Sequence, residues 1–320
     1  MKTLSHILKA LLGLSLIAYM FYSGKLNITS ILGIKHHPYL IAGAFFIILV
    51  AIMTTYYRWK ILLAGQGIYG RDKEFIPLFF IGLFFSSILP GVVSGDIIKS
   101  AYIIKKTPDK KAAAVLTIIL DRIIGLIGLM IICCVGFAAN INTVNQHPAL
   151  KTLAVIMALT LVALLIFAMI GLSRRIGQTK VFNFMLNKVP FSKIVTNLYE
   201  AFHTYRDRRR LLLHALIISI FNHTLCIIGF FMITRALGFK LLDPKFYLFI
   251  VPTGMLTSAI PITPSGIGIG QAAFLKLFEW ALGVKNTIGA DAATIWQAMS
   301  ISIYMVGVYF YATYRRTLKE

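Results

Sequence analysis

The sequence reads ILPGVVSGD at residues 88–96 and IPITPSGIGIGQ at residues 260–271. In both places proline and glycine interrupt a strongly apolar segment. Helix-breaking backbone inside a bilayer is tolerated only where it is buried in protein or lines a cavity. Paired interruptions of this kind are the best sequence indication of a transporter's substrate site. The predicted hinge residues are therefore those of the two breaks: Pro90, Gly91, Gly95, Pro261, Pro264, Gly266, Gly268 and Gly270.

The composition of the chain is that of an integral membrane protein. Its 320 residues are 58% hydrophobic and 13% charged, with a mean hydropathy of +0.81, whereas a soluble domain is about a quarter charged. This leaves nothing for a sizeable soluble domain, so we expect one helical membrane domain over residues 1–320. The apolar residues gather into eight segments: 7–23, 39–57, 75–89, 113–139, 150–172, 211–237, 246–282 and 292–314.

The basic residues lie mainly in loops between these segments, and the net charge is +21. The loop 173–210 holds nine Lys and Arg residues, and the loop 94–112 holds five. Because cytoplasmic loops are enriched in Lys and Arg, both loops are predicted to be cytoplasmic. Nucleic-acid binding needs a water-soluble basic face, so this pattern favours anionic membrane lipids as partners. We expect a multi-pass protein of the bacterial inner (plasma) membrane with both termini in the cytoplasm.

The loop charges also predict how the two interrupted segments enter the bilayer. Arg58, Lys60, Arg71 and Lys73 precede segment 75–89, and the basic loop 94–112 follows it. Both ends of that segment are therefore expected on the cytoplasmic side, and by the same logic both ends of the seventh segment lie outside. This predicts an all-α fold of six transmembrane helices plus two re-entrant helical hairpins. The two halves, about 1–139 and 150–320, would form an inverted repeat.

Four charged residues near the first break are the strongest candidates for a binding site. Asp96 and Lys99 follow the break, and Asp121 and Arg122 are adjacent within a long apolar segment. A charged side chain at the centre of a membrane helix costs roughly 2.5–3.5 kcal/mol on insertion scales, so each needs a partner. Asp96 and Lys99 are the nearest in the predicted topology. Ser94 or Asp96 can cap the helix after the break, whose N-terminus together with Lys99 would attract a lipid phosphate. The structural alternatives are a plain helix cap and an ion pair that fixes the hairpin.

The second break carries no charge, and its polar candidates are Ser265 and Gln271, with Thr263 beside them. They predict a neutral polar path, although small residues also serve plain helix packing. His223, in the middle of an apolar segment, is interpreted as a hydrogen-bond partner between helices rather than a titrating group. Residues 189–205 predict an amphipathic helix on the inner leaflet. Three cysteines without metal-ligand spacing are interpreted as small buried hydrophobes: Cys133, Cys134 and Cys226.

Several motifs carry a family resemblance: YRWKIL at 57–62, GLFFSSILP at 82–90, GDIIK at 95–99, LDR at 120–122 and the glycine-rich stretch 261–273. Together they resemble the transmembrane domain of lysylphosphatidylglycerol synthases, over nearly the whole chain. The resemblance implies lipid translocation by a flippase-like protein. The soluble aminoacyl-transferring domain of the full synthases is absent from this sequence, so we expect no lysyl transfer. The family usually has glutamate where this chain has Gln271, and more often arginine where it has Lys99.

The leading hypothesis is a lipid transporter that moves an anionic phospholipid or a polyprenyl-phosphate-linked lipid between leaflets. A second is a membrane enzyme acting on a lipid phosphate or glycolipid, but the sequence lacks HExxH, P-loop and nucleophile-elbow motifs. A third is a partner that presents lipid to a separate lipid- or glycan-synthesis enzyme. We predict no catalytic residue, metal or other cofactor. The predicted substrate-binding residues are Asp96, Lys99, Asp121, Arg122, Ser265 and Gln271.

Overall fold

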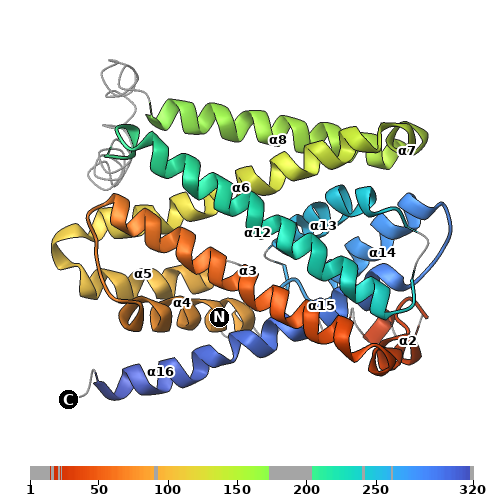
Figure 1. The fold of residues 1–320 in the computed structure, drawn as a ribbon, viewed down its shortest axis with the longest axis horizontal. Helices are drawn as coiled ribbons and strands as arrows, with labels where there is room; N and C mark the ends of the chain where they lie inside the picture. The colour runs from red at the N-terminus through yellow and green to blue at the C-terminus, as the bar shows by residue number, and fades with distance from the viewer. Residues whose placement is uncertain are drawn as a thin grey trace.

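The computed structural model describes residues 24–89, 93–172, 204–239, 242–260 and 262–317, with a few residues between 15 and 22. Every regular element in these ranges is a helix, which confirms the all-helical class (Figure 1). Several predicted features lie wholly or mostly outside the described residues: Pro90, Gly91, Pro261, the first apolar segment and the amphipathic helix at 189–205.

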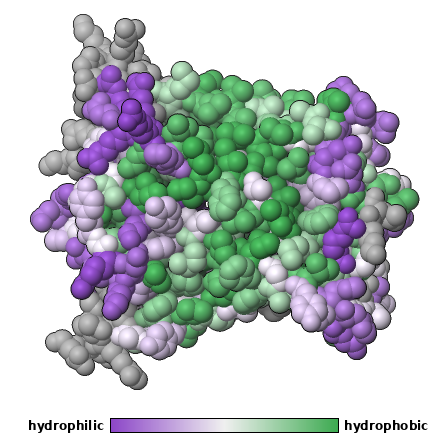
Figure 2. All heavy atoms as spheres, in the orientation of Figure 1, coloured by the Kyte–Doolittle hydropathy of each residue, from purple (hydrophilic) through white to green (hydrophobic). Residues whose placement is uncertain are grey.

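Five stretches are long and apolar enough to cross a bilayer: Pro38–Gly65, Pro108–Ala139, Pro148–Met169, Arg209–Ala236 and Ile288–Thr313. They correspond to helices α3 (Pro38–Gly65), α6 (Lys111–Ala139), α8 (Pro148–Leu172), α12 (Arg209–Ala236) and the consecutive pair α15 (Ile288–Tyr304) and α16 (Val306–Thr317). An apolar belt covers the middle of the surface between two hydrophilic ends (Figure 2). The chain is therefore a multi-pass membrane protein.

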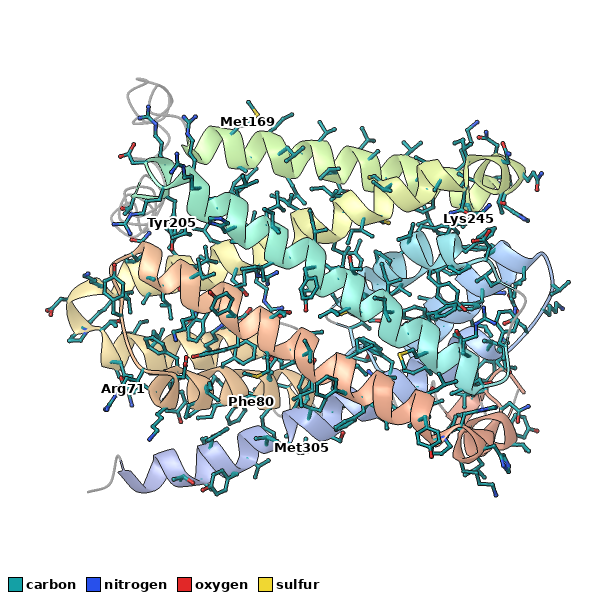
Figure 3. The ribbon with its side chains drawn as sticks, viewed as in Figure 1. Arg71, Phe80, Met169, Tyr205, Lys245 and Met305 are labelled. Carbon is teal, nitrogen blue, oxygen red and sulfur yellow. The ribbon has the colours of Figure 1, made fainter. Side chains whose placement is uncertain are left out.

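The two hydrophilic ends can be named by residues that project there. Arg71 and Tyr205 lie towards one end and Lys245 towards the other (Figure 3). We call these the Arg71 end and the Lys245 end. The short helices α2 (Ile28–Gly33) and α7 (Ile141–Gln146) lie at the Lys245 end (Figure 1).

Two pairs of shorter helices contain the interrupted segments. Helices α4 (Asp72–Ile88) and α5 (Val93–Lys106) pack on each other in the half of the molecule nearer the Arg71 end. Helices α13 (Pro244–Ser258) and α14 (Ile269–Leu282) pack on each other in the half nearer the Lys245 end (Figure 1). Each pair therefore comprises the helices that precede and follow one of the two breaks.

Local chemistry explains where three of these four helices begin. Helix α4 carries Asp72 and Glu74 in its first turn, where carboxylates favour the helix dipole. The side chain of Asp243 caps α13 by accepting a hydrogen bond from the backbone N–H of Lys245 at 3.0 Å, and proline follows it at the first helical position. Gly268 is the N-cap residue before α14, and its φ of 83° is a backbone conformation that glycine adopts at little cost.

Ion pairs at the Arg71 end join α3, α4 and α5. Lys60 bonds the Asp72 carboxylate at 2.6 Å, and Lys106 lies 3.4 Å from Glu74. The hydrogen bonds from Lys60 and from the Tyr56 hydroxyl hold the pKa of Asp72 below its ordinary value. The start of α4, which lies outside the five apolar stretches, is therefore held by ion pairs to α3 and to the end of α5.

The long helices pack in a regular pattern. Helices α3 and α12 pack along each other, α6 packs on α13, and α16 packs on α4. The largest apolar cluster lies among α6, α12, α13, α14 and α15, and a second cluster around Trp59 joins α3 to α4. Helix α8 packs on α6 and α7 and leaves much of its apolar surface exposed, as expected of a helix that faces lipid.

One boundary from the sequence was wrong. The second apolar segment was predicted to end at Tyr57, with Arg58 and Lys60 in the following loop. Helix α3 instead continues to Gly65, so both residues are helical, and Arg58 is only 5% exposed. Hydropathy ended the segment at its first charges, but a charge can remain inside a helix when another helix supplies its counter-ion.

Candidate functional site

A close contact between two glycines positions the charged residues of α5. A Cβ atom on Gly95 would clash with the backbone oxygen of Gly82 and with Oγ of Ser86, so only glycine lets α4 and α5 approach this closely. The helix begins at Val93, before Asp96, and the Asp96 carboxylate accepts from Arg122. The N-cap predicted at Ser94 or Asp96 is therefore wrong, because both residues lie within the helix, and Asp96 forms an ion pair instead.

The adjacent residues Asp121 and Arg122 pair with two different helices. Arg122 donates to both carboxylate oxygens of Asp96 on α5, at 2.7 and 3.0 Å. Asp121 accepts a 2.7 Å hydrogen bond from Nε of Arg58 on α3. Adjacent residues on a helix point about 100° apart, so the two side chains reach two different helices that flank α6. The sequence predicted partners on α5 for both residues. The pairing of Arg122 with Asp96 is confirmed, whereas Asp121 pairs with Arg58 on α3 and not with a residue of α5.

Lys99 is the third cation of this group. The residue is 5% exposed, and its ammonium lies 3.7 Å from the ring centroid of Trp59 and 5.3 Å from that of Phe79. Such an ammonium is attracted by the negative ring faces. It forms no ion pair within 4 Å among the residues that the structure describes. The group therefore holds three cations and two carboxylates, with Lys99 left over.

These five residues line one cavity of about 220 Å³, which we call the charged chamber: Arg58, Asp96, Lys99, Asp121 and Arg122. The Arg122 side chain is 49% exposed, whereas those of Arg58 and Asp121 are 6% and 7% exposed. An anion entering this chamber would meet Arg122 at its open side and Lys99 deeper within. The structure thus brings together all four charged residues singled out from the sequence and adds Arg58.

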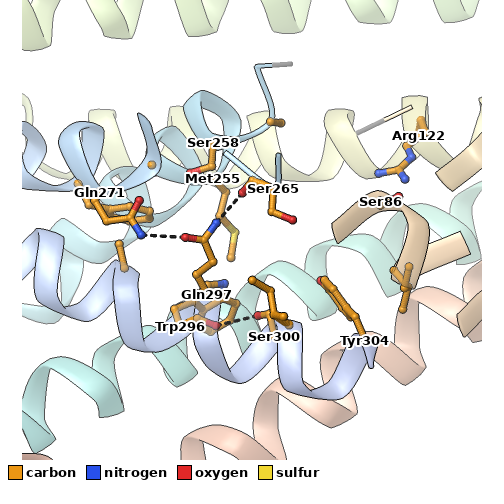
Figure 4. Close-up of a pocket in the computed structure, with 16 residues that line it drawn as sticks. Ser86, Arg122, Met255, Ser258, Ser265, Gln271, Trp296, Gln297, Ser300 and Tyr304 are labelled. Atoms are coloured by element: carbon orange, nitrogen blue, oxygen red, sulfur yellow. Dashed lines mark hydrogen bonds between the residues drawn. The ribbon is translucent and has the colours of Figure 1, made fainter. Parts of the chain in front are cut away.

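The second break is organised by a chain of amide hydrogen bonds. Oε1 of Gln271 accepts from the backbone N–H of Gly268 at 2.7 Å, and its Nε2 donates to Oε1 of Gln297 at 2.8 Å. Nε2 of Gln297 donates to the backbone oxygen of Ser265 at 2.6 Å (Figure 4). Gln297 was not singled out from the sequence as a site residue, although an amide within an apolar helix is a usable signal. Gln271 is 1% exposed, so these buried hydrogen bonds hold the loop before α14 in place.

The glycines of this break have local structural reasons. Gly266 has a φ of 68°, and a Cβ on it would clash with the backbone of Ser258. A Cβ on Gly270 would press on the Ser258 hydroxyl. The Thr263 hydroxyl donates to the backbone oxygen of Ile267 at 2.8 Å, which closes the turn that contains Pro264. The break is therefore a defined loop rather than a frayed helix.

A second cavity, of about 240 Å³, lies between α13, α14 and α15, and we call it the neutral chamber (Figure 4). Both Ser265 and Gln271 line it, as the sequence suggested for a neutral polar path. It shares four lining residues with the charged chamber: Leu83, Ser86, Arg122 and Tyr304. The two chambers therefore adjoin, and the residues predicted as substrate-binding are divided between them.

The loop of the second break also touches the end of α4, just before the first break. The Ser265 hydroxyl donates to the backbone oxygen of Ser87, near the end of α4, at 3.1 Å. Ser265 has a φ of 49°, a backbone conformation that residues other than glycine rarely adopt. The surrounding loop therefore has to hold the Ser265 backbone in this conformation. The contact joins the helix pair of one half to that of the other.

His223 on α12 was interpreted as a hydrogen-bond partner between helices, and the structure confirms this. Its Nε2 lies 3.0 Å from the backbone oxygen of Gly125 on α6. A Cβ on Gly125 would press on the Arg58 guanidinium, so this glycine also leaves room for the buried ion pair. Cys133 and Cys226 are buried, and Cys133 contacts the Thr253 hydroxyl at 3.3 Å.

Comparison with known proteins gives one match. The family model described as lysylphosphatidylglycerol synthase TM region matches residues 6–307. No curated protein matches the chain, and no solved structure matches it. The matched range includes both breaks and all the residues of the two chambers. Because the match covers nearly the whole sequence, the chain belongs to the lysylphosphatidylglycerol synthase transmembrane-region family.

Proposed function

We propose that this protein carries the headgroup of an anionic lipid across the bilayer. The observation that carries the proposal is the charge of the charged chamber, where three cations face two carboxylates. Burying a charged group without a partner is costly, so an unpaired ammonium at Lys99 favours a chamber that receives an anion. A lipid phosphate supplies that anion, while its acyl chains remain in the surrounding membrane.

The proposed architecture is six transmembrane helices with two re-entrant hairpins, α4–α5 and α13–α14, related as an inverted repeat of residues 1–139 and 150–320. In such a repeat α3 corresponds to α12, α4 to α13, and α6 to α15–α16. The packing supports this correspondence, because α6 packs on α13 as α16 packs on α4, and α3 packs on α12. The basic loops favour a cytoplasmic Arg71 end, with both termini on that side of a bacterial inner membrane. Inverted repeats of this kind allow alternating access to a site near the midplane.

Within this architecture the side chains take distinct roles. Lys99 and Arg122 attract the phosphate, and Asp96 holds the Arg122 guanidinium in a bidentate ion pair that fixes its direction. Arg58 and Asp121 hold α3 against α6. The neutral chamber then offers hydroxyl and amide groups on the way to the Lys245 end. Movement of the two hairpins apart at the contact between Ser265 and Ser87 would open the path.

A transport assay tests the proposal. We expect Lys99→Met to lower the rate at which fluorescent phosphatidylglycerol crosses reconstituted vesicles by about tenfold or more, the effect of losing a hydrogen bond to a charged group. Methionine keeps the packing against Trp59 and Phe79 but removes the charge. Lys105→Met is the matched control, because Lys105 is exposed on the same helix. A Lys99→Met protein as fast as this control would contradict the role of Lys99.

The two alternatives are separable in the same experiment. Both candidate acid–base groups, Asp96 and Asp121, are engaged by arginines, so the structure adds no support for an enzyme. Transport by the purified protein alone would distinguish a transporter from a partner that only presents lipid to a synthesis enzyme. Co-purification with such an enzyme, without transport, would favour the latter.

A further inference from the structure

The neutral chamber has an unusual balance of side chains for a site beside a phosphate-binding group. None of the described residues that line it is acidic, and its one charged lining residue, Arg122, lies at the border with the charged chamber. The rest of its polar lining consists of hydroxyls and amides. They include Ser258, Ser265, Gln271, Gln297, Ser300 and Tyr304.

Three of these polar groups form a path along α15. Gln297, Ser300 and Tyr304 are spaced three and four residues apart, so they lie on one face of the helix. Figure 4 shows them between Gln271 at one end of the chamber and Arg122 at the other. Tyr304 lines both chambers. A headgroup attached to a phosphate beside Arg122 would therefore extend along this face.

The amides at the far end retain hydrogen-bonding capacity. A glutamine Nε2 carries two N–H groups. Gln271 uses one of them on Gln297, and Gln297 uses one on the backbone oxygen of Ser265. Each Nε2 therefore donates one hydrogen bond among the described residues and carries a second N–H that could serve a ligand. Hydroxyl groups both donate and accept, so a ligand rich in hydroxyls matches this lining.

An ammonium group fits the same space poorly. Among the described residues no carboxylate lines the neutral chamber to pair with it, and in the adjoining charged chamber Asp96 is already bonded by two nitrogens of Arg122. Without a counter-ion, an ammonium there would be costly to desolvate, with only aromatic rings such as those of Phe274 and Trp296 to attract it. Arg122 would also repel it. The chamber therefore discriminates by charge as well as by hydrogen bonding.

We propose that the transported lipid is a phosphodiester whose headgroup beyond the phosphate is uncharged and hydroxylated, such as glycerol, inositol or a sugar. The neutral chamber holds that headgroup and excludes ammonium headgroups. This inference rests on the proposed function, since it requires the phosphate to occupy the charged chamber.

Reconstituted vesicles with four acyl-labelled probes test it. Phosphatidylglycerol and phosphatidylinositol carry hydroxylated headgroups, phosphatidylethanolamine carries an ammonium, and phosphatidic acid has nothing beyond its phosphate. We expect the first two to cross about tenfold faster than phosphatidylethanolamine and clearly faster than phosphatidic acid, as for one or two hydrogen bonds. Equal rates for all four, or phosphatidic acid as fast as phosphatidylglycerol, would overturn the inference and leave the proposed function standing. No transport of any probe would overturn both.

A matched pair of variants places the selection in the chamber. Gln271→Glu adds a carboxylate of nearly the same shape, far from Arg122. We expect it to raise the phosphatidylethanolamine rate relative to that of phosphatidylglycerol by about tenfold. Gln271→Met, of similar size without charge, slows phosphatidylglycerol and gives phosphatidylethanolamine no gain. If Gln271→Glu does not fold, Ser300→Asp against Ser300→Asn makes the same comparison. An unchanged ratio in the folded carboxylate variant refutes selection by this chamber.

Discussion

Arg58 and Asp121 show how a single residue pair determines the interior of this protein. Each is 5% exposed, and they meet at 2.7 Å between α3 and α6. A buried ion pair adds little net stability over apolar residues of the same shape, but removing one partner leaves an uncompensated charge. The pair therefore acts as a constraint on how the two helices pack.

Removal of one member of this pair should be strongly destabilising. We expect Asp121→Asn to lower the free energy of unfolding by about 3–5 kcal/mol, because Arg58 loses its counter-ion. Titration with a denaturing detergent, followed by circular dichroism, measures the change. The combined variant Arg58→Met, Asp121→Leu should recover most of the loss.

An exposed ion pair provides the control for this prediction. Asp72 pairs with Lys60 at the surface, with side chains that are 55% and 33% exposed. Exposed ion pairs contribute little because water screens them, so Asp72→Asn should change the free energy of unfolding far less than Asp121→Asn. Equal losses for Asp72→Asn and Asp121→Asn would show that the buried pair has no special role.

At the scale of helices, glycine determines how closely α4 and α5 approach. Gly95 faces the backbone of Gly82, and this contact places Asp96 and Lys99 opposite α6 and α3. Side chains larger than hydrogen must force the two helices apart. The packing of α4 on α5, which positions charged residues of the charged chamber, therefore depends on a residue that has no side chain beyond hydrogen.

A single methyl group at this contact should disturb the hairpin. We expect Gly95→Ala to cost about 1–3 kcal/mol of stability, typical of overpacking, and to slow phosphatidylglycerol transport by displacing Lys99. Thermal unfolding in detergent and the vesicle assay measure the two effects. Gly33→Ala is the matched control, because a Cβ there meets nothing within 4 Å. If both variants behave like the parent protein, the helices can separate without consequence.

At the scale of the whole molecule, the two helix pairs meet where the loop before α14 touches the end of α4. The bond from Ser265 to the backbone oxygen of Ser87 links regions 178 residues apart in the sequence. The chambers on either side share Arg122 and Tyr304. The adjoining chambers and the contact between the two helix pairs therefore lie together, and both are made from residues of the two halves of the sequence.

Cysteine labelling tests the proposed re-entrant topology. Single cysteines at Lys73 and Lys105 flank α4–α5, and cysteines at Lys245 and Lys285 flank α13–α14; all four positions are exposed. In sealed vesicles an impermeant maleimide should label the first two from the cytoplasmic face and the last two from the opposite face. Labelling of Lys73→Cys and Lys105→Cys from opposite faces would mean that α4–α5 crosses the bilayer.

Much of the architecture could be anticipated from composition. Long apolar segments predicted the membrane class, and proline and glycine marked both breaks, because these properties belong to individual residues and their neighbours. Asp96, Lys99, Asp121 and Arg122 were recognisable because charges are rare in apolar segments. The end of α3 was misplaced for the same reason, since hydropathy treats Arg58 as a surface charge wherever its partner lies.

The partnerships themselves required the packed helices. Arg58 and Asp121 are 63 residues apart, and Gln271 and Gln297 are 26 apart on different helices. Which charges pair, and which cation is left over, depends on distances between helix faces that no local pattern encodes. The sequence alone determined a helical membrane protein with two broken segments and buried charge. Only the tertiary structure decided that the charged and neutral chambers adjoin, because side chains from separate helices form both.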